Sequence, residues 1–367
     1  METLLAPASV TGGACPEAPS GASDAPALLG KRKMRDADDQ VAPLGEAPTK
    51  RVRLDAGGQA DLPPCPPPAV ELELDRLNPH PRDKLIRFEA EPNHKYYLYA
   101  SEADALAADA ALAAGRPSSE AKLSLPRFEF PCSVTGYVHR WFKPYDESGA
   151  LAGVRRSLKP HNVAMRDWSD DQIRAKWAAD RDEAAEQGRI MHKHIEDYYN
   201  GRPVSAEAAE YRATRREWML FLEFDAWRRD QGLEPYRTEW SIWLNGLPGQ
   251  PDMIFRRRSD GALFVFDWKR YKELKMPSGY AGTVDDAPEC IRHLSDCNFN
   301  HAMLQTNAYQ HILQTEYGLR IAGRSMVVLH PNNEHFVCEP LPDYQKETRE
   351  CIELHALEQL DKALSAA

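Results

Sequence analysis

The stretch "PDMIFRRRSDGALFVFDWKR" (251–270) consists of two apolar runs joined by an Asp-Gly pair. Such a pair between alternating apolar runs is typical of a β-hairpin. Asp252 opens the first run and Asp267 lies near the end of the second, so a hairpin would place their carboxylates side by side. Charged residues are rare in strands, and an unpaired buried charge is costly. The two carboxylates therefore need a partner.

Lys269 follows Asp267 at a spacing of two residues. Because side chains alternate between the faces of a strand, Asp267 and Lys269 point to the same face and Trp268 to the opposite one. Two carboxylates at hydrogen-bonding distance repel each other, and one is protonated near neutral pH unless a cation lies between them. A divalent ion would resolve this conflict. The alternative is a salt-bridged pair at a strand end, in which Lys269 neutralises one Asp.

The segment "GRIMHKHIEDYYNG" (188–201) predicts a helix that ends at Asn200-Gly201. His192 and Glu196 are four residues apart, so they share one face of this helix. A lone helical histidine is more often a packing or surface residue than a ligand, and we expect this of His194. A His and a Glu on one face, followed by strands that offer Asp and Asp-x-Lys, favour a cation site.

Hydrophobic periodicity predicts an α/β fold, with a central mixed sheet flanked by helices in the order helix, three strands, helix, strand. A capping box at Ser169 and Gln172 begins a helix that we expect to end near Gly188, just before the helix that carries His192. Further elements are predicted as strands at 94–100, 236–244, 325–330 and 335–341, a strand-to-helix passage at 133–146, and helices at 205–231, at 300–318 and from about 343.

Composition limits the classes of function. The chain has 367 residues, 42% hydrophobic and 28% charged, which favours one large globular domain with appendages. No apolar run approaches the ~18 residues of a membrane span, so no membrane partner is expected. The net charge of -10 argues against coating nucleic acid by bulk electrostatics, but it allows a local basic groove. Seven scattered cysteines without a CxxC pair indicate reduced thiols, and no iron–sulfur cluster is expected.

Three regions are predicted along the chain: a tail at 1–70, an accessory region at 71–168 that packs on the core, and the core itself at 169–367 with a C-terminal helix. The tail is rich in Ala, Pro and Gly, a composition typical of disorder. Its basic clusters "KRKMR" (31–35) and "TKRVRLD" (49–55, basic at 50–53) resemble a nuclear import signal, which implies the nucleus and the import machinery as a partner. A mitochondrial presequence fits less well, because the first thirty residues contain acidic residues and no Arg.

The motifs "GRIMHKHIE", "GQPDMIF", "FDWKR" and "QTNAY" stand in this order along the chain. Together they resemble the RecB-like exonuclease branch of the PD-(D/E)xK nuclease superfamily. Within that branch the chain is most similar to the exonucleases of mitochondrial genome maintenance and to related viral and eukaryotic exonucleases. The likeness covers about 90–345 and is firmest over 188–313. A lone D-x-K motif would be a weak signal, whereas four ordered motifs are specific.

The resemblance implies a fold with an αβββαβ core, like that of restriction endonucleases, and a set of site residues. It implies that His192, Asp252, Asp267 and the backbone carbonyl of Trp268 bind a divalent metal. Lys269 would orient or activate the attacking water. The expected ion is Mg²⁺, with Mn²⁺ as a good substitute because one ligand is a His nitrogen.

Other positions match the family's pattern less directly. Glu196 matches the family's helical acid and is grouped with the catalytic residues; contact with the metal directly or through water is open. Glu239 lies where relatives often carry an acid, and a structural or supporting role is as well indicated there as a catalytic one. Gln305 and Tyr309 match a motif that borders the site and contacts the DNA, although ordinary helix packing explains the same pattern. Arg270 is grouped with them as a DNA-binding residue.

We therefore expect a metal-dependent deoxyribonuclease, an exonuclease on single-stranded DNA or DNA ends that serves DNA repair, recombination or replication. The alternative from another class is a DNA-binding module that keeps the fold without turnover; an endonuclease or an RNA-directed nuclease also stays open. Relatives with an iron–sulfur cluster carry a tight cysteine group after the D-x-K strand, and this chain lacks it. It also lacks a GxxxxGK[ST] motif, so a helicase or polymerase partner would be a separate chain.

Overall fold

The computed structural model describes residues 73–89, 95–113 and 127–366. All of them belong to one structural unit, residues 41–367. The predicted tail at 1–70, with its disorder and its basic clusters, lies outside the described residues, and these expectations stay predictions.

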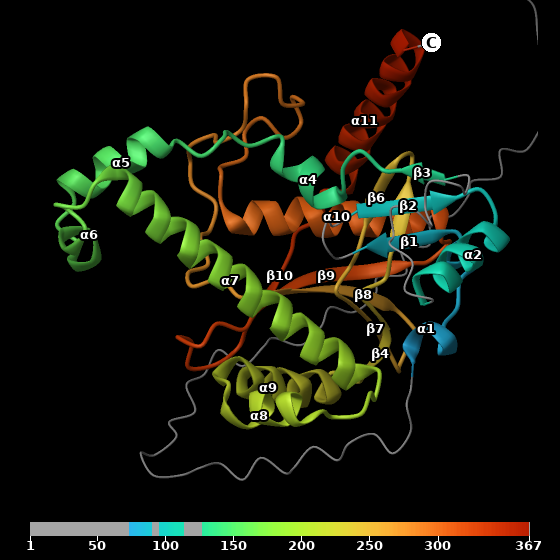
Figure 1. Ribbon diagram of the computed structural model, residues 1–367. Helices are drawn as coiled ribbons and strands as arrows, with labels where there is room; N and C mark the ends of the chain where they lie inside the picture. Colours follow the sequence, from blue (N-terminus) through green and yellow to red (C-terminus); the bar gives the residue numbers. More distant parts are fainter. Residues whose placement is uncertain (1–72, 90–94, 114–126, 367) are drawn as a thin grey trace, which may run out of the picture. The chain divides into compact units, whose positions relative to one another are not determined.

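A five-stranded mixed sheet occupies the centre of the fold (Figure 1). Strands β8 and β9 run parallel, and the other neighbours in the sheet are antiparallel. Helices lie on both faces, so the predicted α/β fold with a central mixed sheet is confirmed. In spatial order the strands are β10 (Val337–Pro340), β9 (Ile321–Val328), β8 (Leu263–Lys269), β7 (Met253–Arg257) and β4 (Leu233–Thr238).

The predicted hairpin joins β7 to β8. Its turn closes through the N–H of Arg257, which donates to the carbonyl of Ala262 at 2.8 Å. Gly261 adopts a φ of 70°, which only a residue without a Cβ adopts at low cost. The register pairs Met253 with Phe266, so Asp252 lies next to the end of β8. The hairpin expected from the Asp-Gly pair is confirmed.

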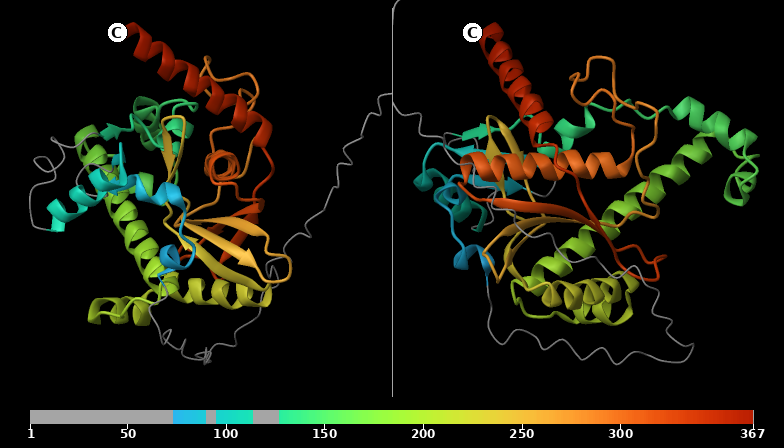
Figure 2. Two further views of the ribbon diagram at one scale, coloured as in Figure 1. Left: turned by 90° about the vertical axis from the view of Figure 1, so that its right-hand side faces the viewer. Right: turned by 180° about the vertical axis from the view of Figure 1, so that it is seen from behind.

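Alternating side chains divide the core into two layers. Ile254 and Val265 pack on the side of α10 (Asn298–Glu316) and α4 (Val134–His139). Phe255 and Phe266 pack on the side of α7 (Asp170–Tyr199) and α9 (Arg216–Asp230). Figure 2 shows α10 end-on above the sheet with α9 below it. By the same alternation, the side chains at 267 and 269 face α10 and that of Trp268 faces α9.

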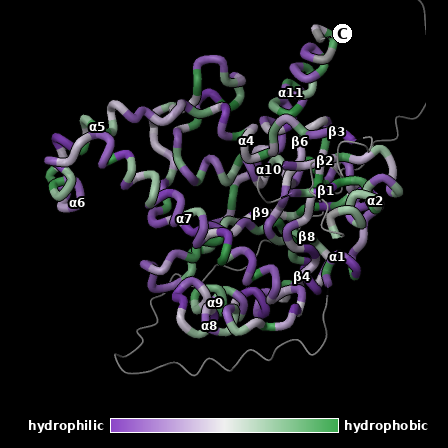
Figure 3. The backbone as a smooth tube through the Cα atoms, viewed as in Figure 1, coloured by the Kyte–Doolittle hydropathy of each residue, from purple (hydrophilic) through white to green (hydrophobic). Residues whose placement is uncertain are grey.

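Helix α7 is a single helix of 30 residues, and the predicted break near Gly188 is wrong. A Cβ at Gly188 would meet nothing within 4 Å, so this glycine lies at an open position and costs only about 1 kcal/mol of helix propensity. The capping box at Ser169 and Gln172 is confirmed. The first half of α7 extends away from the sheet toward α5 (Glu147–Arg156) and α6 (Pro160–Ala164), and most of its residues are hydrophilic (Figures 1 and 3).

Two other predicted elements are each divided. The helix expected at 205–231 is two helices, α8 (Ala206–Thr214) and α9, because Arg215 between them is extended. The strand expected at 236–244 ends at Thr238, and the chain then enters a small separate hairpin. That hairpin consists of β5 (Ile242–Leu244) and β6 (Leu247–Gly249).

The region before residue 140 adds a three-stranded sheet that includes the predicted strand at 94–100. At the other end, the predicted strand beside β9 and the predicted C-terminal helix are both present. Among the described residues, no helix has the length and apolar character needed to cross a membrane. The remaining elements are α1 (Leu74–Leu77), η1 (Pro81–Lys84), β1 (Ile86–Glu89), β2 (Lys95–Tyr99), α2 (Glu102–Ala113), β3 (Arg127–Glu129) and α11 (Gln345–Ala366).

Candidate metal centre

The two aspartates meet at the open end of the β7–β8 hairpin. Asp252 is fixed there, because its Oδ2 accepts a hydrogen bond from the backbone N–H of Trp268 at 2.7 Å. Asp267 is fully buried and Asp252 is 8% exposed. Both aspartates are therefore buried at neighbouring strand positions, as the hairpin predicts, although Asp267 is not among the donors whose atoms lie within 4.8 Å of one another.

Helix α7 brings His192 to the same point. Its Nε2 lies 3.1 Å from the carbonyl oxygen of Trp268, and its Nδ1 lies 3.4 Å from Oε1 of Glu239. The same Nδ1 is 3.7 Å from Oδ1 of Asp252. His192, Glu239 and Asp252 can each offer a ligand atom within 4.8 Å of the other two. A nitrogen and several oxygens at this spacing form a donor set suited to Mg²⁺ or Mn²⁺.

Charge in this cluster is unbalanced. Burial lowers the pKa of His192, but the carboxylates of Asp252 and Glu239 outweigh burial and raise it to about 9. Burial raises the pKa of Asp267 to about 6, although Lys269 opposes the shift. Burial also raises the pKa of Asp252. Three carboxylates thus face one ammonium and one imidazole. If a divalent cation displaced the imidazole proton, its two positive charges would balance the two negative charges that remain.

Lys269 forms an ion pair with Asp267, with 2.7 Å between Nζ and Oδ2. This is the pairing that a purely structural explanation of the D-x-K motif requires. Oδ2 of Asp267 is thus satisfied by the Lys269 ammonium, whereas within the described residues Oδ1 has no hydrogen-bond partner. A buried carboxylate oxygen without a partner is uncommon in proteins, and it fits an oxygen that can coordinate a cation.

Side chains of helix α10 also contact the cluster. Gln305 Oε1 accepts from Lys269 Nζ at 3.4 Å, and Gln305 Nε2 donates to the hydroxyl of Tyr309 at 2.7 Å. Gln305 Nε2 also donates to Oγ1 of Thr135 on α4 at 3.1 Å. A Cβ at Gly249 would lie 2.6 Å from Cε1 of Tyr309, so this position has no room for a larger residue. Gln305 and Tyr309 thus border the cluster, as expected.

Two expected site residues lie outside the cluster. Glu196 shares a helix with His192, but its carboxylate pairs with Arg202 at 3.1 Å and with Lys193 at 3.8 Å. Arg270 pairs with the nearly buried Glu217 at 2.7 Å, because the residue after Lys269 points to the other face of the sheet. Their roles in catalysis and DNA binding stay predictions that this geometry does not favour.

Some residues near the cluster were not singled out by the sequence. Tyr96, from the small N-terminal sheet, donates from its hydroxyl to Oε1 of Gln250 at 3.3 Å. Burial, and then the nearby groups of Tyr309, Glu239 and Asp252, raise the pKa of Tyr96 well above its usual value. Gln250 stands directly before the Pro-Asp motif, and this position is the only feature of the sequence that places it near the cluster. Nothing local marks Tyr96, because the contact depends on tertiary packing.

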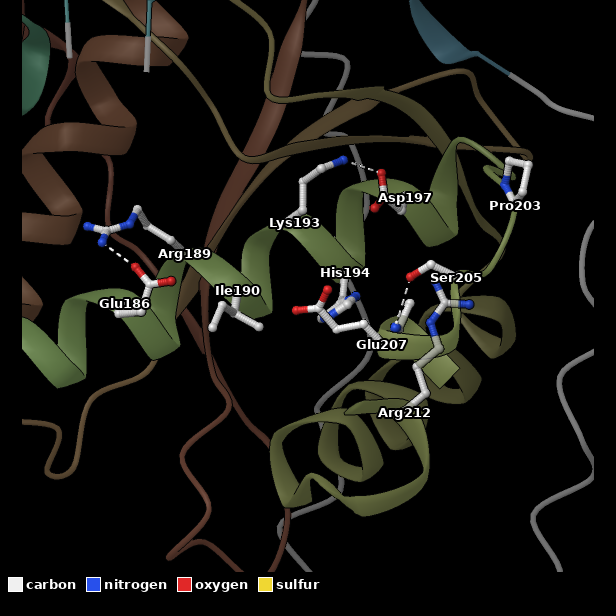
Figure 4. Close-up of a pocket in the computed structure, with 11 residues that line it drawn as sticks. Glu186, Arg189, Ile190, Lys193, His194, Asp197, Pro203, Ser205, Glu207 and Arg212 are labelled. Carbon is white, nitrogen blue, oxygen red and sulfur yellow. Dashed lines mark hydrogen bonds and ion pairs between the residues drawn. The ribbon is translucent and has the colours of Figure 1, made fainter. Parts of the chain in front are cut away.

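A cavity of about 420 Å³ lies on the α8 side of α7. His194 lies there beside Glu207, and Lys193 pairs with Asp197 at its rim (Figure 4). The ring of His194 is stacked on Tyr211 at 4.1 Å and is almost fully buried. The expectation that His194 is a packing residue agrees with these contacts, and the two histidines of α7 have different surroundings.

No protein-family model matches the chain, and a comparison with curated proteins gives no significant match. The likeness to RecB-like nucleases therefore rests on the four sequence motifs alone.

Proposed function

We propose that the protein is a metal-dependent nuclease that hydrolyses DNA phosphodiester bonds, and that it acts as an exonuclease on single-stranded DNA or DNA ends. One observation carries the proposal. His192, Glu239 and Asp252 gather their donor atoms beside the Trp268 carbonyl at one strand end, and the buried Asp267 pairs with Lys269 there through Oδ2, while its Oδ1 lacks a partner among the described residues.

The donor set fits a divalent ion. His192, Glu239 and Asp252 would hold Mg²⁺ or Mn²⁺. Asp267, which the motif assigns as a further ligand, would join them from the neighbouring strand. Bound at this point, the ion would neutralise charge on the scissile phosphate and make the attacking water more acidic. Asp252 is held in a fixed orientation by the Trp268 N–H, so this ligand needs little reorganisation on binding.

Lys269 would act as a fixed positive charge. Burial lowers its pKa, but Asp267 and other nearby groups outweigh burial, so the pKa is raised and the side chain keeps its proton. A protonated lysine cannot take a proton from water at neutral pH. It can orient that water, and it can stabilise the negative charge that develops on the phosphate oxygens. Gln305 holds the ammonium from the α10 side at 3.4 Å.

The finer parts of the proposal rest on the sequence motifs. The choice of an exonuclease over an endonuclease follows from the RecB-like resemblance, and so does a role in DNA repair, recombination or replication. The nucleus is proposed from the basic clusters at 31–35 and 50–53. A helicase or polymerase that exposes the strand would be a separate partner.

The test uses purified protein with Mg²⁺ or Mn²⁺ and end-labelled single-stranded DNA, linear in one reaction and circular in the other. Linear DNA should be degraded and circles should survive, with Asp252→Asn as the inactive control. Degradation of circles would show an endonuclease instead. Binding of DNA without cleavage, at any metal concentration, would favour the DNA-binding module. Preferential cleavage of a matched RNA strand would favour an RNA-directed nuclease.

A further inference from the structure

Glu239, between β4 and β5, has a left-handed backbone with a φ of 42°. This conformation is unfavourable for any residue with a Cβ. Such backbone strain persists only where the surroundings enforce it, and it is concentrated at functional sites. Here it directs the carboxylate of Glu239 to within 3.4 Å of His192.

The backbone of Glu239 is held directly on both sides. Its N–H donates to the carbonyl of Asp252 at 3.0 Å, and its own carbonyl accepts from Nε2 of Gln250 at 3.0 Å. The preceding residue, Thr238, accepts through Oγ1 from Nδ2 of Asn200, the C-cap of α7, at 2.8 Å. These bonds connect the strained residue to the strand of Asp252 and to the helix of His192.

The carboxylate of Asp83 binds two residues near this position, one on each side of it. Asp83, in η1, accepts from Arg237 Nη1 at 2.8 Å through Oδ2 and from Trp240 Nε1 at 2.7 Å through Oδ1. Asp83 is itself fixed, because Oδ2 also accepts from the backbone N–H of His80 at 2.9 Å. Arg237 and Trp240 are both nearly buried. Residues 237 and 240 therefore cannot move independently of Asp83.

We propose that Asp83 is a positioning residue for the cation site. By holding Arg237 and Trp240 together, it keeps Glu239 in the left-handed conformation that brings the Glu239 carboxylate to His192. The segment 73–89 would thereby be part of the site, although it contributes no ligand. This inference rests on the proposed function in one respect, namely that the cluster binds a divalent ion.

A simpler role for Asp83 would be to attach the segment 73–89 to the core. The neighbouring Arg82 provides a matched comparison, because it pairs with Glu316 at 2.6 Å and donates to the Trp243 carbonyl at 2.9 Å. The variant Glu316→Gln weakens that attachment without touching the residues beside Glu239. If attachment alone mattered, Asp83→Asn and Glu316→Gln would have the same effect.

The experiment measures Mn²⁺ binding by calorimetry on the full chain without DNA. Asp83→Asn should lower the fraction of chains in which Glu239 has the strained conformation. The apparent Mn²⁺ affinity falls by the same factor as this fraction, and we expect about tenfold weaker binding. In a background that carries Glu239→Gln, Asp83→Asn should have no further effect, since the group that it positions is already lost. Glu316→Gln should bind Mn²⁺ like the wild type.

Thermal unfolding in chelator establishes that each variant is folded. If Asp83→Asn fails to fold, Trp240→Phe removes the indole N–H donor, together with part of the buried ring, and should weaken Mn²⁺ binding in the same direction. Wild-type affinity in a folded Asp83→Asn or Trp240→Phe variant would overturn the inference and leave the nuclease proposal intact. If Asp83→Asn weakened Mn²⁺ binding equally with and without Glu239→Gln, the inference would also be overturned and the nuclease proposal left intact. Absence of Mn²⁺ binding to the wild type would overturn both.

Discussion

Replacing each histidine of α7 by alanine should give opposite results in two assays. His192 lies against Glu239, Asp252 and the Trp268 carbonyl. Removing an outer partner of a metal ligand typically costs 10–100-fold in metal affinity or activity, and loss of a ligand should cost at least as much. His192→Ala should therefore weaken Mn²⁺ binding by about 100-fold or more. Cleavage in Mg²⁺ should fall steeply, with partial recovery at raised Mn²⁺ concentration.

His194→Ala should instead affect stability. On sequence grounds this variant should change little, but the structure alters the expected result, because His194 is only 9% exposed and stacks on Tyr211. Loss of the aromatic pair costs about 0.5–1.5 kcal/mol beyond the buried area. The buried Nδ1 of His194 has no hydrogen-bond partner among the described residues, so removing it offsets part of that cost. We expect a net loss of about 1 kcal/mol in the free energy of unfolding.

The assays are Mn²⁺ calorimetry and thermal unfolding in chelator, applied to both variants. Because alanine and histidine differ by only a few tenths of a kcal/mol in helix propensity, a change at one site alone cannot be attributed to the helix. If both variants bound Mn²⁺ like the wild type and lost similar stability, His192 would be a packing residue. The site would then depend on its carboxylates alone.

Three further outcomes are expected. Asp252→Ala or Lys269→Ala should abolish cleavage while DNA binding survives, and near-wild-type turnover of either variant would contradict the site assignment. Gly249→Ala forces a Cβ to 2.6 Å from the Tyr309 ring, so it should cost about 1–3 kcal/mol in the free energy of unfolding and reduce cleavage; an unchanged melting temperature would refute this. Deletion of 1–70 should leave cleavage in vitro unchanged, and a loss of activity would give the tail a role in the site. The last test replaces the basic residues of the two clusters by alanine in a tagged protein, namely Lys31, Arg32, Lys33, Lys50, Arg51 and Arg53. This variant should leave the nucleus in cells, and continued nuclear accumulation would reject the import signal.

The parts of the fold that could be predicted depend on local chemistry. The β7–β8 hairpin follows from an Asp-Gly turn between alternating runs, and the start of α7 follows from its capping box. The closeness of Asp252 and Asp267 follows from the hairpin register. These features involve residues near one another in the chain, so pattern and propensity suffice. The break predicted at Gly188 was wrong because a single glycine is tolerated inside a helix whose other positions are favourable.

The remaining features depend on contacts between distant parts of the chain. Spacing alone made Glu196 the partner of His192, but Arg202 and Lys193 hold that carboxylate elsewhere. Glu239 takes its place near His192 through a left-handed backbone that no propensity indicates. Asp83 lies 154 residues from Arg237, and such a contact exists only after the sheet has assembled. A single sequence has no local signal for it.

The central claim, that the end of β7 and β8 is a divalent-cation site, is tested most directly by anomalous diffraction from crystals grown with Mn²⁺. The account predicts an anomalous peak in contact with the carboxylates of Asp252 and Asp267 and with the His192 ring, and its loss in Asp252→Asn crystals. The absence of a peak there at Mn²⁺ concentrations that saturate binding in solution, or a peak only in the cavity beside His194, would contradict the account.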